Sequence, residues 1–124
     1  ELKPDFVGAY ESLAGVFLEM GELKGAIAQL KKAVEYDPKS SSARNTLGLV
    51  RMKADMLDEA IAEFKEVLRI DPKHVGTQQL LALAYMRKGD FDQAWEEVKR
   101  MRAAGVPIEQ NLLDTLKRAS GREE

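Results

Sequence analysis

The stretch AIAEFKEVLRIDP, residues 60–72, decides the fold, because a closely similar stretch, AIAQLKKAVEYDP, occupies residues 26–38. The offset between the two copies is 34 residues. A further shift by the same offset brings AWEEV, residues 94–98, under AIAEF, residues 60–64. A fixed period of this length is typical of solenoid proteins, in which each unit buries its apolar face by stacking on its neighbours. The sequence therefore predicts a stack of repeats.

Each repeat is predicted to hold two helices. In the first repeat, apolar residues recur at spacings of three and four, as on one face of a helix: Tyr10, Leu13, Ala14 and Phe17. Gly21 is expected to end this helix, because glycine adopts the left-handed conformation without strain, and Gly89 and Asp55 occupy the same place in the other repeats. The second helix is expected to end at Asp37-Pro38, because proline disfavours a helical residue before it.

The period also divides the chain into units. We expect a tail of a preceding repeat at residues 1–6, three helix-turn-helix repeats at 7–40, 41–74 and 75–108, a capping helix at 107–120 and a frayed tail at 121–124. Pro107 suits the first turn of the capping helix. The terminal repeat of a solenoid needs such a helix, with a polar outer face, to stay in solution.

Composition narrows the classes of partner. The chain has 124 residues, of which 44% are hydrophobic and 32% charged, as expected for one helical domain. Its 19 basic and 21 acidic residues leave no positive excess for phosphates, so we expect no nucleic acid partner. No apolar run approaches a membrane span, so no direct membrane insertion is expected. The absence of cysteine leaves the compartment open between cytosol and periplasm, with the cytosol slightly favoured.

The repeated residues resemble the tetratricopeptide repeat family, whose unit is a 34-residue helix-turn-helix. The matching residues are Leu13-Ala14, Leu47-Gly48 and Leu81-Ala82 in the first helices, Ala26, Ala60 and Ala94 in the second helices, and Asp37-Pro38 and Asp71-Pro72 at the ends. The resemblance implies an all-α, right-handed α-solenoid whose first helices line a concave groove. Arg44 and Arg51 replace aromatic residues of the family pattern, and we expect their stems to cover the neighbouring repeat with their charges in water.

The resemblance places a partner-binding groove on the first helices, on the side that faces away from the packed residues. The expected groove residues are Glu11, Gly15, Leu18, Glu19, Asn45, Leu49, Met52, Lys53, Gln79, Leu83, Met86 and Arg87. The leucines and methionines among them are expected either to form one exposed apolar stripe or to be covered in part by the next helix. The amides of Asn45 and Gln79 could hydrogen-bond an extended peptide backbone.

No other pattern in the sequence indicates catalysis, a cofactor or a metal. His74 stands alone in a turn and is expected to be a surface residue, and Trp95 is expected to pack in the core or on the capping helix. The charges around Glu63 and Glu97 have helical spacing and indicate solvated faces. No glycine loop for phosphates and no nucleophile beside a base is present, so we do not expect an enzyme.

Three functions remain, in order of preference. The first is a non-catalytic protein-protein interaction scaffold that binds a peptide or helix of a partner protein in the groove. The second is self-association through the end helices, because the first helix has no upstream neighbour to cover its flank. The third is RNA binding, by analogy with related helical repeats, and the near-neutral charge with the acidic Glu11 and Glu19 argues against it.

Overall fold

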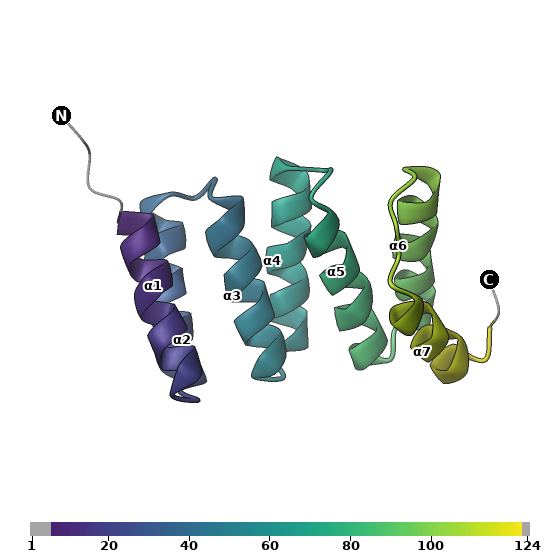
Figure 1. Ribbon diagram of the computed structural model, residues 1–124, viewed down its shortest axis with the longest axis horizontal. Coiled ribbons are helices and arrows are strands. Elements are labelled where there is room, and N and C mark those ends of the chain that lie inside the picture. The colour runs from purple at the N-terminus through teal and green to yellow at the C-terminus, as the bar shows by residue number, and fades with distance from the viewer. Residues whose placement is uncertain (1–5, 123–124) are drawn as a thin grey trace.

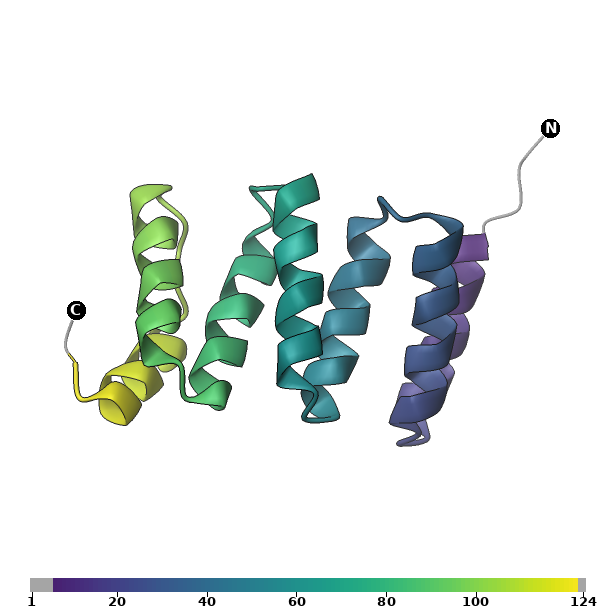
Figure 2. The same cartoon turned by 180° about the vertical axis from the view of Figure 1, so that it is seen from behind.

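The computed structural model describes residues 6–122, which form seven α-helices and no strand. Their bounds are α1 Phe6–Glu19, α2 Leu23–Tyr36, α3 Ser41–Lys53, α4 Leu57–Ile70, α5 Val75–Lys88, α6 Phe91–Ala103 and α7 Gln110–Ser120. The helices stand side by side in two layers, with α1, α3 and α5 in front in Figure 1 and α2, α4 and α6 in front in Figure 2. The expected tail of a preceding repeat, residues 1–6, lies outside the described residues except for Phe6.

A residue with a positive φ angle follows the first helix of each pair within two positions. The values are 75° at Gly21, 60° at Asp55 and 87° at Gly89, one period apart. After each of them the chain closes back on the helix in the same way: Glu22 N donates to Phe17 O at 2.8 Å, Met56 N to Arg51 O at 2.8 Å and Asp90 N to Tyr85 O at 2.9 Å. The predicted turns at Gly21 and Gly89 are therefore confirmed, and Asp55 adopts the same left-handed conformation.

The second helix of each of the first two pairs ends where the sequence predicts. Helices α2 and α4 stop immediately before Asp37 and Asp71, each of which precedes a proline. Ser40 then caps α3, because its Oγ accepts a hydrogen bond from Ala43 N at 3.2 Å. His74 stands one period later and caps α5 through its ring Nδ1, which accepts from Thr77 N at 3.3 Å. His74 is partly exposed, and its role as a helix cap is one that the sequence analysis did not assign to it.

Small residues bring the helices of a pair into close contact. Ala26, Ala60 and Ala94 are fully buried, one on each second helix. Gly48 on α3 faces Phe64 on α4 so closely that a Cβ atom at Gly48 would lie 2.5 Å from Phe64 Cε1. The small residues of the repeat pattern therefore set the distance between α3 and α4.

Helix α7 follows the third helix pair and contacts both α5 and α6, and in Figure 1 it lies in front of the lower part of α6. Trp95 on α6 is buried, as the sequence predicted, and its Nε1 donates to Ser120 Oγ at 3.0 Å. The expectation that Pro107 lies in the first turn of this helix is wrong, because α7 begins at Gln110. Pro107 instead lies in the connection between α6 and α7, where its carbonyl accepts from Gln79 Nε2 at 3.3 Å.

Part of the tail that we expected to fray has partners. Gly121 ends α7 with a φ angle of 72°, and its N–H donates to Lys117 O at 2.9 Å. Arg122 forms an ion pair with Asp92 on α6. Residues 123–124 lie outside the described residues.

Candidate interaction groove

The expected groove residues lie on α1, α3 and α5, in the front layer of Figure 1. Glu19, Lys53 and Arg87 are exposed near the ends of their helices. The remaining residues, apart from Met52, are partly exposed: Glu11, Gly15, Leu18, Asn45, Leu49, Gln79, Leu83 and Met86. Met52 is only 3% exposed, because it packs within the core cluster that extends from α3 to α7. We considered two arrangements of the apolar groove residues. The prediction of one exposed stripe that includes Met52 is therefore wrong.

Three polar groove residues at equivalent places bond to the next unit of the chain. Glu11 Oε2 accepts from Ser42 Oγ at 3.4 Å, Asn45 Oδ1 accepts from Thr77 Oγ1 at 2.6 Å, and Gln79 Nε2 donates to Pro107 O at 3.3 Å. Positions 11, 45 and 79 are separated by one period each. These side chains therefore link successive repeats, a role that the sequence analysis did not assign to them.

Arg87 also makes contacts within the protein. Its Nη1 donates to the carbonyl of Met52 at 3.1 Å, and its Nη2 lies 3.7 Å from Asp55 Oδ1. The side chain therefore ties the end of α5 to the turn after α3.

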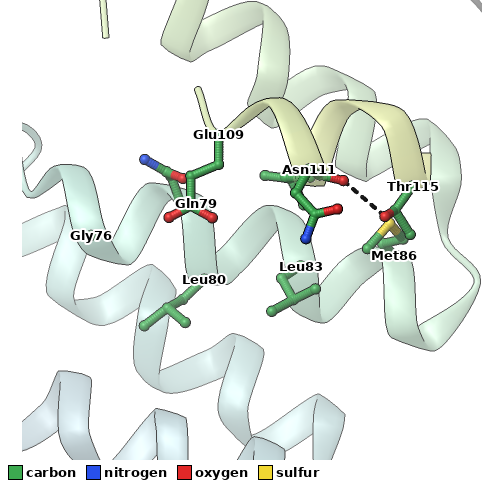
Figure 3. A pocket seen from close by; sticks show the side chains of 9 residues that line it. Gly76, Gln79, Leu80, Leu83, Met86, Glu109, Asn111 and Thr115 are labelled. Carbon is green, nitrogen blue, oxygen red and sulfur yellow. Dashed lines mark hydrogen bonds between the residues drawn. The ribbon is translucent and has the colours of Figure 1, made fainter. Parts of the chain in front are cut away.

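A pocket of about 370 Å³ lies between α5 and α7, beside the expected groove residues of α5. Leu80, Leu83 and Met86 of α5 and Leu112 of α7 supply its apolar lining. Figure 3 shows Leu83 and Met86 opposite Asn111 and Thr115, with Gln79 beside Glu109. Thr115 Oγ1 donates to Asn111 O at 2.8 Å, so the hydroxyl is held by its own helix. Gly76 completes the lining, and a Cβ atom there would meet only His74 Cε1, at 3.9 Å.

The sequence pointed to the α5 side of this pocket but not to the α7 side. Gln79, Leu83 and Met86 were expected groove residues, and they line it. Glu109, Asn111, Leu112 and Thr115 were missed, because nothing in the sequence of the capping helix shows that it folds back toward the first-helix layer. The non-helical connection between Ala103 and Gln110 makes this return possible.

Two other expectations about charges are wrong. Arg44 and Arg51 do not keep their charges in water, since each guanidinium pairs with Glu63, at 3.2 Å and 3.1 Å. Glu63 therefore does not belong to a solvated face. Glu97, one period later, is only 3% exposed, and burial raises the pKa of its carboxyl group despite the opposing charge of Arg100.

The described residues carry neither a metal-binding cluster nor a membrane span. Among residues 6–122, no group of three histidine or acidic side chains is placed to hold a metal ion. Within the same range, no helix combines the length and the apolar character needed to cross a membrane.

Antiparallel helix pairs with a 34-residue period, stacked side by side, define a helical-repeat protein. Family models described as "Tetratricopeptide repeat" and "TPR repeat" match residues 51–113 and 15–55. The chain belongs to the tetratricopeptide repeat family. This family generally supplies non-catalytic scaffolds, and the fold of this chain supports a protein-protein interaction scaffold. A search of curated protein sequences found no match.

Solved structures of the same fold include MamA and YrrB. A point mutant of MamA is 25% identical, with a TM-score of 0.71 over 81% of this chain and 73% of its own. MamA 41-end from Desulfovibrio magneticus RS-1 is 17% identical, with a TM-score of 0.85 over 97% of this chain and 67% of its own. YrrB, "a TPR protein with an unusual peptide-binding site", is 23% identical, with a TM-score of 0.67 over 93% of this chain and 52% of its own.

These likenesses confirm the predicted fold class, an all-α solenoid. The chain spans between about half and three quarters of the length of these structures.

Proposed function

We propose that the chain binds a peptide segment of a partner protein on the face formed by α1, α3 and α5, and that the pocket between α5 and α7 holds one apolar side chain of that segment. The observation that carries this proposal is the pocket itself, which is open, largely apolar and about 370 Å³ in volume. A cavity of this size falls in the range that accepts small ligands or single large side chains.

The rim of the pocket suits a peptide backbone. Gln79 and Asn111 carry amides, and Glu109 carries a carboxylate, beside the leucine and methionine lining. Polar groups of this kind fix the orientation of a segment whose affinity comes from apolar burial. Met86 can adapt its shape to the side chain that enters. YrrB, described as a TPR protein with an unusual peptide-binding site, supports a peptide as the class of ligand for this fold.

Gly76 offers a direct test, because a side chain added there extends from the pocket lining into open space. Peptides would first be selected from a displayed random library on the natural chain. Their affinities would then be measured for Gly76→Phe, whose ring would obstruct the pocket, and for Gly76→Ala, which adds one methyl group. We expect Gly76→Phe to weaken binding about ten-fold or more while Gly76→Ala retains it. Equal affinities for the two variants would overturn the proposal.

A second candidate function, self-association, is favoured by the exposed flank of α1. Leu13 and Val16 are 43% and 50% exposed. Their equivalents one period later, Leu47 and Val50, are buried by the preceding helix pair. Burial of this flank by a second copy would remove apolar area from water. Sedimentation over a range of concentrations, with Leu13→Glu as the comparison, should then show a dimer that the substitution disrupts, and a monomer throughout would exclude it.

A further inference from the structure

A second pocket, of about 360 Å³, lies between α4, α5 and α6 and shares no residue with the pocket at α7. It is lined by Lys65, Leu68, Pro72, Gln78, Leu81, Tyr85, Gln93, Glu97 and Arg100. The proposed groove function does not use this pocket. The equivalent place one period earlier in the same chain, the junction of α2, α3 and α4, is filled by side chains. These side chains indicate which chemical group the second pocket could hold.

Two arginines fill the earlier junction. Arg44 and Arg51 both extend from α3 to the carboxylate of Glu63, at 3.2 Å and 3.1 Å. The three side chains are largely buried, with exposed fractions of 17%, 16% and 14%. One period later these positions are Gln78, Tyr85 and Glu97. The acidic residue is thus kept at the second junction, whereas both guanidinium groups are missing.

Gln78 shows where the missing group would lie. Arg44 Nε donates to Pro38 O at 2.9 Å, and Gln78 Nε2 makes the equivalent bond to Pro72 O at 3.4 Å. The shorter side chain of Gln78 makes only this bond, whereas the guanidinium of Arg44 also reaches the Glu63 carboxylate. Gln78 Oε1 is left buried without a hydrogen-bond partner. A buried acceptor in this state is costly, and a donor in the pocket would relieve the cost.

Glu97 is the second acceptor. Its side chain is 5% exposed, and Arg100, whose own side chain is 64% exposed, pairs with one of its oxygens, Oε1, from the next turn of α6. Burial raises the pKa of the Glu97 carboxyl group, so Arg100 does not fully compensate the desolvation. The other cation at the pocket is Lys65, whose Nζ lies 5.7 Å from the centre of the Tyr85 ring. An incoming cation would compete with Arg100 for the carboxylate and with Lys65 for the ring.

We propose that this pocket binds a guanidinium group, placed between the Glu97 carboxylate, Gln78 Oε1 and the Tyr85 ring. The planar guanidinium presents several N–H donors in a fixed geometry, so it can bond two separate acceptors at once. It also stacks on aromatic rings more readily than an ammonium group does. The ligand class is therefore arginine, either as the free amino acid or as a side chain of a partner protein.

The test is an NMR titration of ¹⁵N-labelled protein with N-acetyl-arginine methylamide, compared with N-acetyl-lysine methylamide and with free L-arginine. We expect the arginine amide to shift the signals of Gln78 and its neighbours in the pocket, and to bind about ten-fold more tightly than the lysine amide. Tighter binding of the capped probe than of free arginine would assign a protein side chain, and the reverse would assign the amino acid. No shift with either arginine probe, or equal affinity for the lysine amide, would overturn the proposal.

Variants of the chain separate binding in the pocket from binding elsewhere. Glu97→Gln should weaken arginine binding about ten-fold or more, whereas Glu96→Gln removes the same charge from the exposed neighbouring residue and should leave it unchanged. Gln78→Arg supplies the guanidinium from α5, as Arg44 does on α3, and should abolish binding. Arg100→Gln should strengthen it by removing the competing cation.

The groove variant Gly76→Phe should leave arginine binding intact, so the two sites are tested independently. Undiminished binding in Glu97→Gln or in Gln78→Arg would contradict the proposed site.

Discussion

Trp95 on α6 and Ser120 on α7 are joined by a hydrogen bond of 3.0 Å from the indole Nε1 to the hydroxyl Oγ. The same hydroxyl donates to Leu116 O at 2.6 Å, and Trp95 is buried. This bond fixes the last turn of α7 on the end of the stack, and α7 in turn supplies one wall of the pocket at α5.

Ser120→Ala should therefore loosen α7 before the rest of the chain. We expect it to lower the free energy of unfolding by about 1 kcal/mol, because it leaves the buried indole N–H without its acceptor. Amide hydrogen exchange should rise in α7 and stay unchanged in α1 to α4. A double-mutant cycle with Trp95→Phe should show that the two losses are not additive. Additive effects would contradict a direct interaction between the two side chains.

Two glycines should respond in opposite ways to the same substitution. A Cβ atom at Gly15 on α1 would meet nothing within 4 Å, so Gly15→Ala should stabilise the fold by about 0.5–1 kcal/mol through helix propensity. A Cβ atom at Gly48 would lie 2.5 Å from the buried ring of Phe64, so Gly48→Ala should cost about 1–3 kcal/mol. Urea unfolding of both variants measures the contrast. A stabilised Gly48→Ala would mean that α3 and α4 are not as close as described.

Glu63 should be important for stability because its carboxylate pairs with both Arg44 and Arg51. Glu63→Gln would leave Arg44 and Arg51 largely buried without their counter-charge, at a cost of about 1.5–3 kcal/mol. The matched control is Glu66→Gln, which breaks an ion pair with the exposed Arg69 and should cost much less than Glu63→Gln does. Chemical unfolding in parallel distinguishes them. An equal loss of unfolding free energy in the two variants would show that the pairing of Glu63 with Arg44 and Arg51 stabilises the fold no more than an exposed ion pair does.

The buried Glu97 gives the stability of the chain a defined dependence on pH. Burial raises the pKa of this carboxyl group in the folded protein above its ordinary value of 4.5, so the folded state binds the proton more tightly than the unfolded state. The contribution of Glu97 to stability is therefore complete below the unfolded pKa and is lost as the pH rises through the folded pKa.

The comparison of Glu97→Gln with the natural chain isolates this effect, since all other titrating groups are shared. The stability of the variant relative to the natural chain should increase as the pH rises from below 4.5 toward neutrality. Urea unfolding in acidic and in neutral buffer provides the measurement. If the stability of Glu97→Gln relative to the natural chain stayed constant or decreased as the pH rises, the raised pKa of Glu97 would be contradicted.

The backbone of the repeats was largely predictable because each turn depends on local chemistry. Gly21, Gly89 and the Asp-Pro pairs act on their own segments, and their 34-residue spacing places each helix end. The pairing of Glu63 with Arg44 and Arg51 was not predictable in the same way. Helical spacing shows which face a charge occupies, but the register between α3 and α4 decides which charges meet.

The candidate site was only partly predictable for a related reason. The first-helix face of α5 was foreseen, including Gln79, Leu83 and Met86, because the repeat pattern assigns it. The burial of Met52 depends on packing in the core cluster from α3 to α7, and the α7 wall depends on the direction of the connection after α6. Neither follows from the pattern of a single helix.

The most direct test of the central claim, a peptide segment bound at the α5 and α7 pocket, is site-directed photo-crosslinking. The chain has no cysteine, so one introduced cysteine accepts one benzophenone label. Glu109→Cys places the label at the pocket rim, and Lys31→Cys places it on the exposed surface of α2 as the control. We predict that a peptide selected on the natural chain crosslinks to the label at position 109 and not to that at position 31. Crosslinking from position 31 alone, or equally from both, would contradict the account.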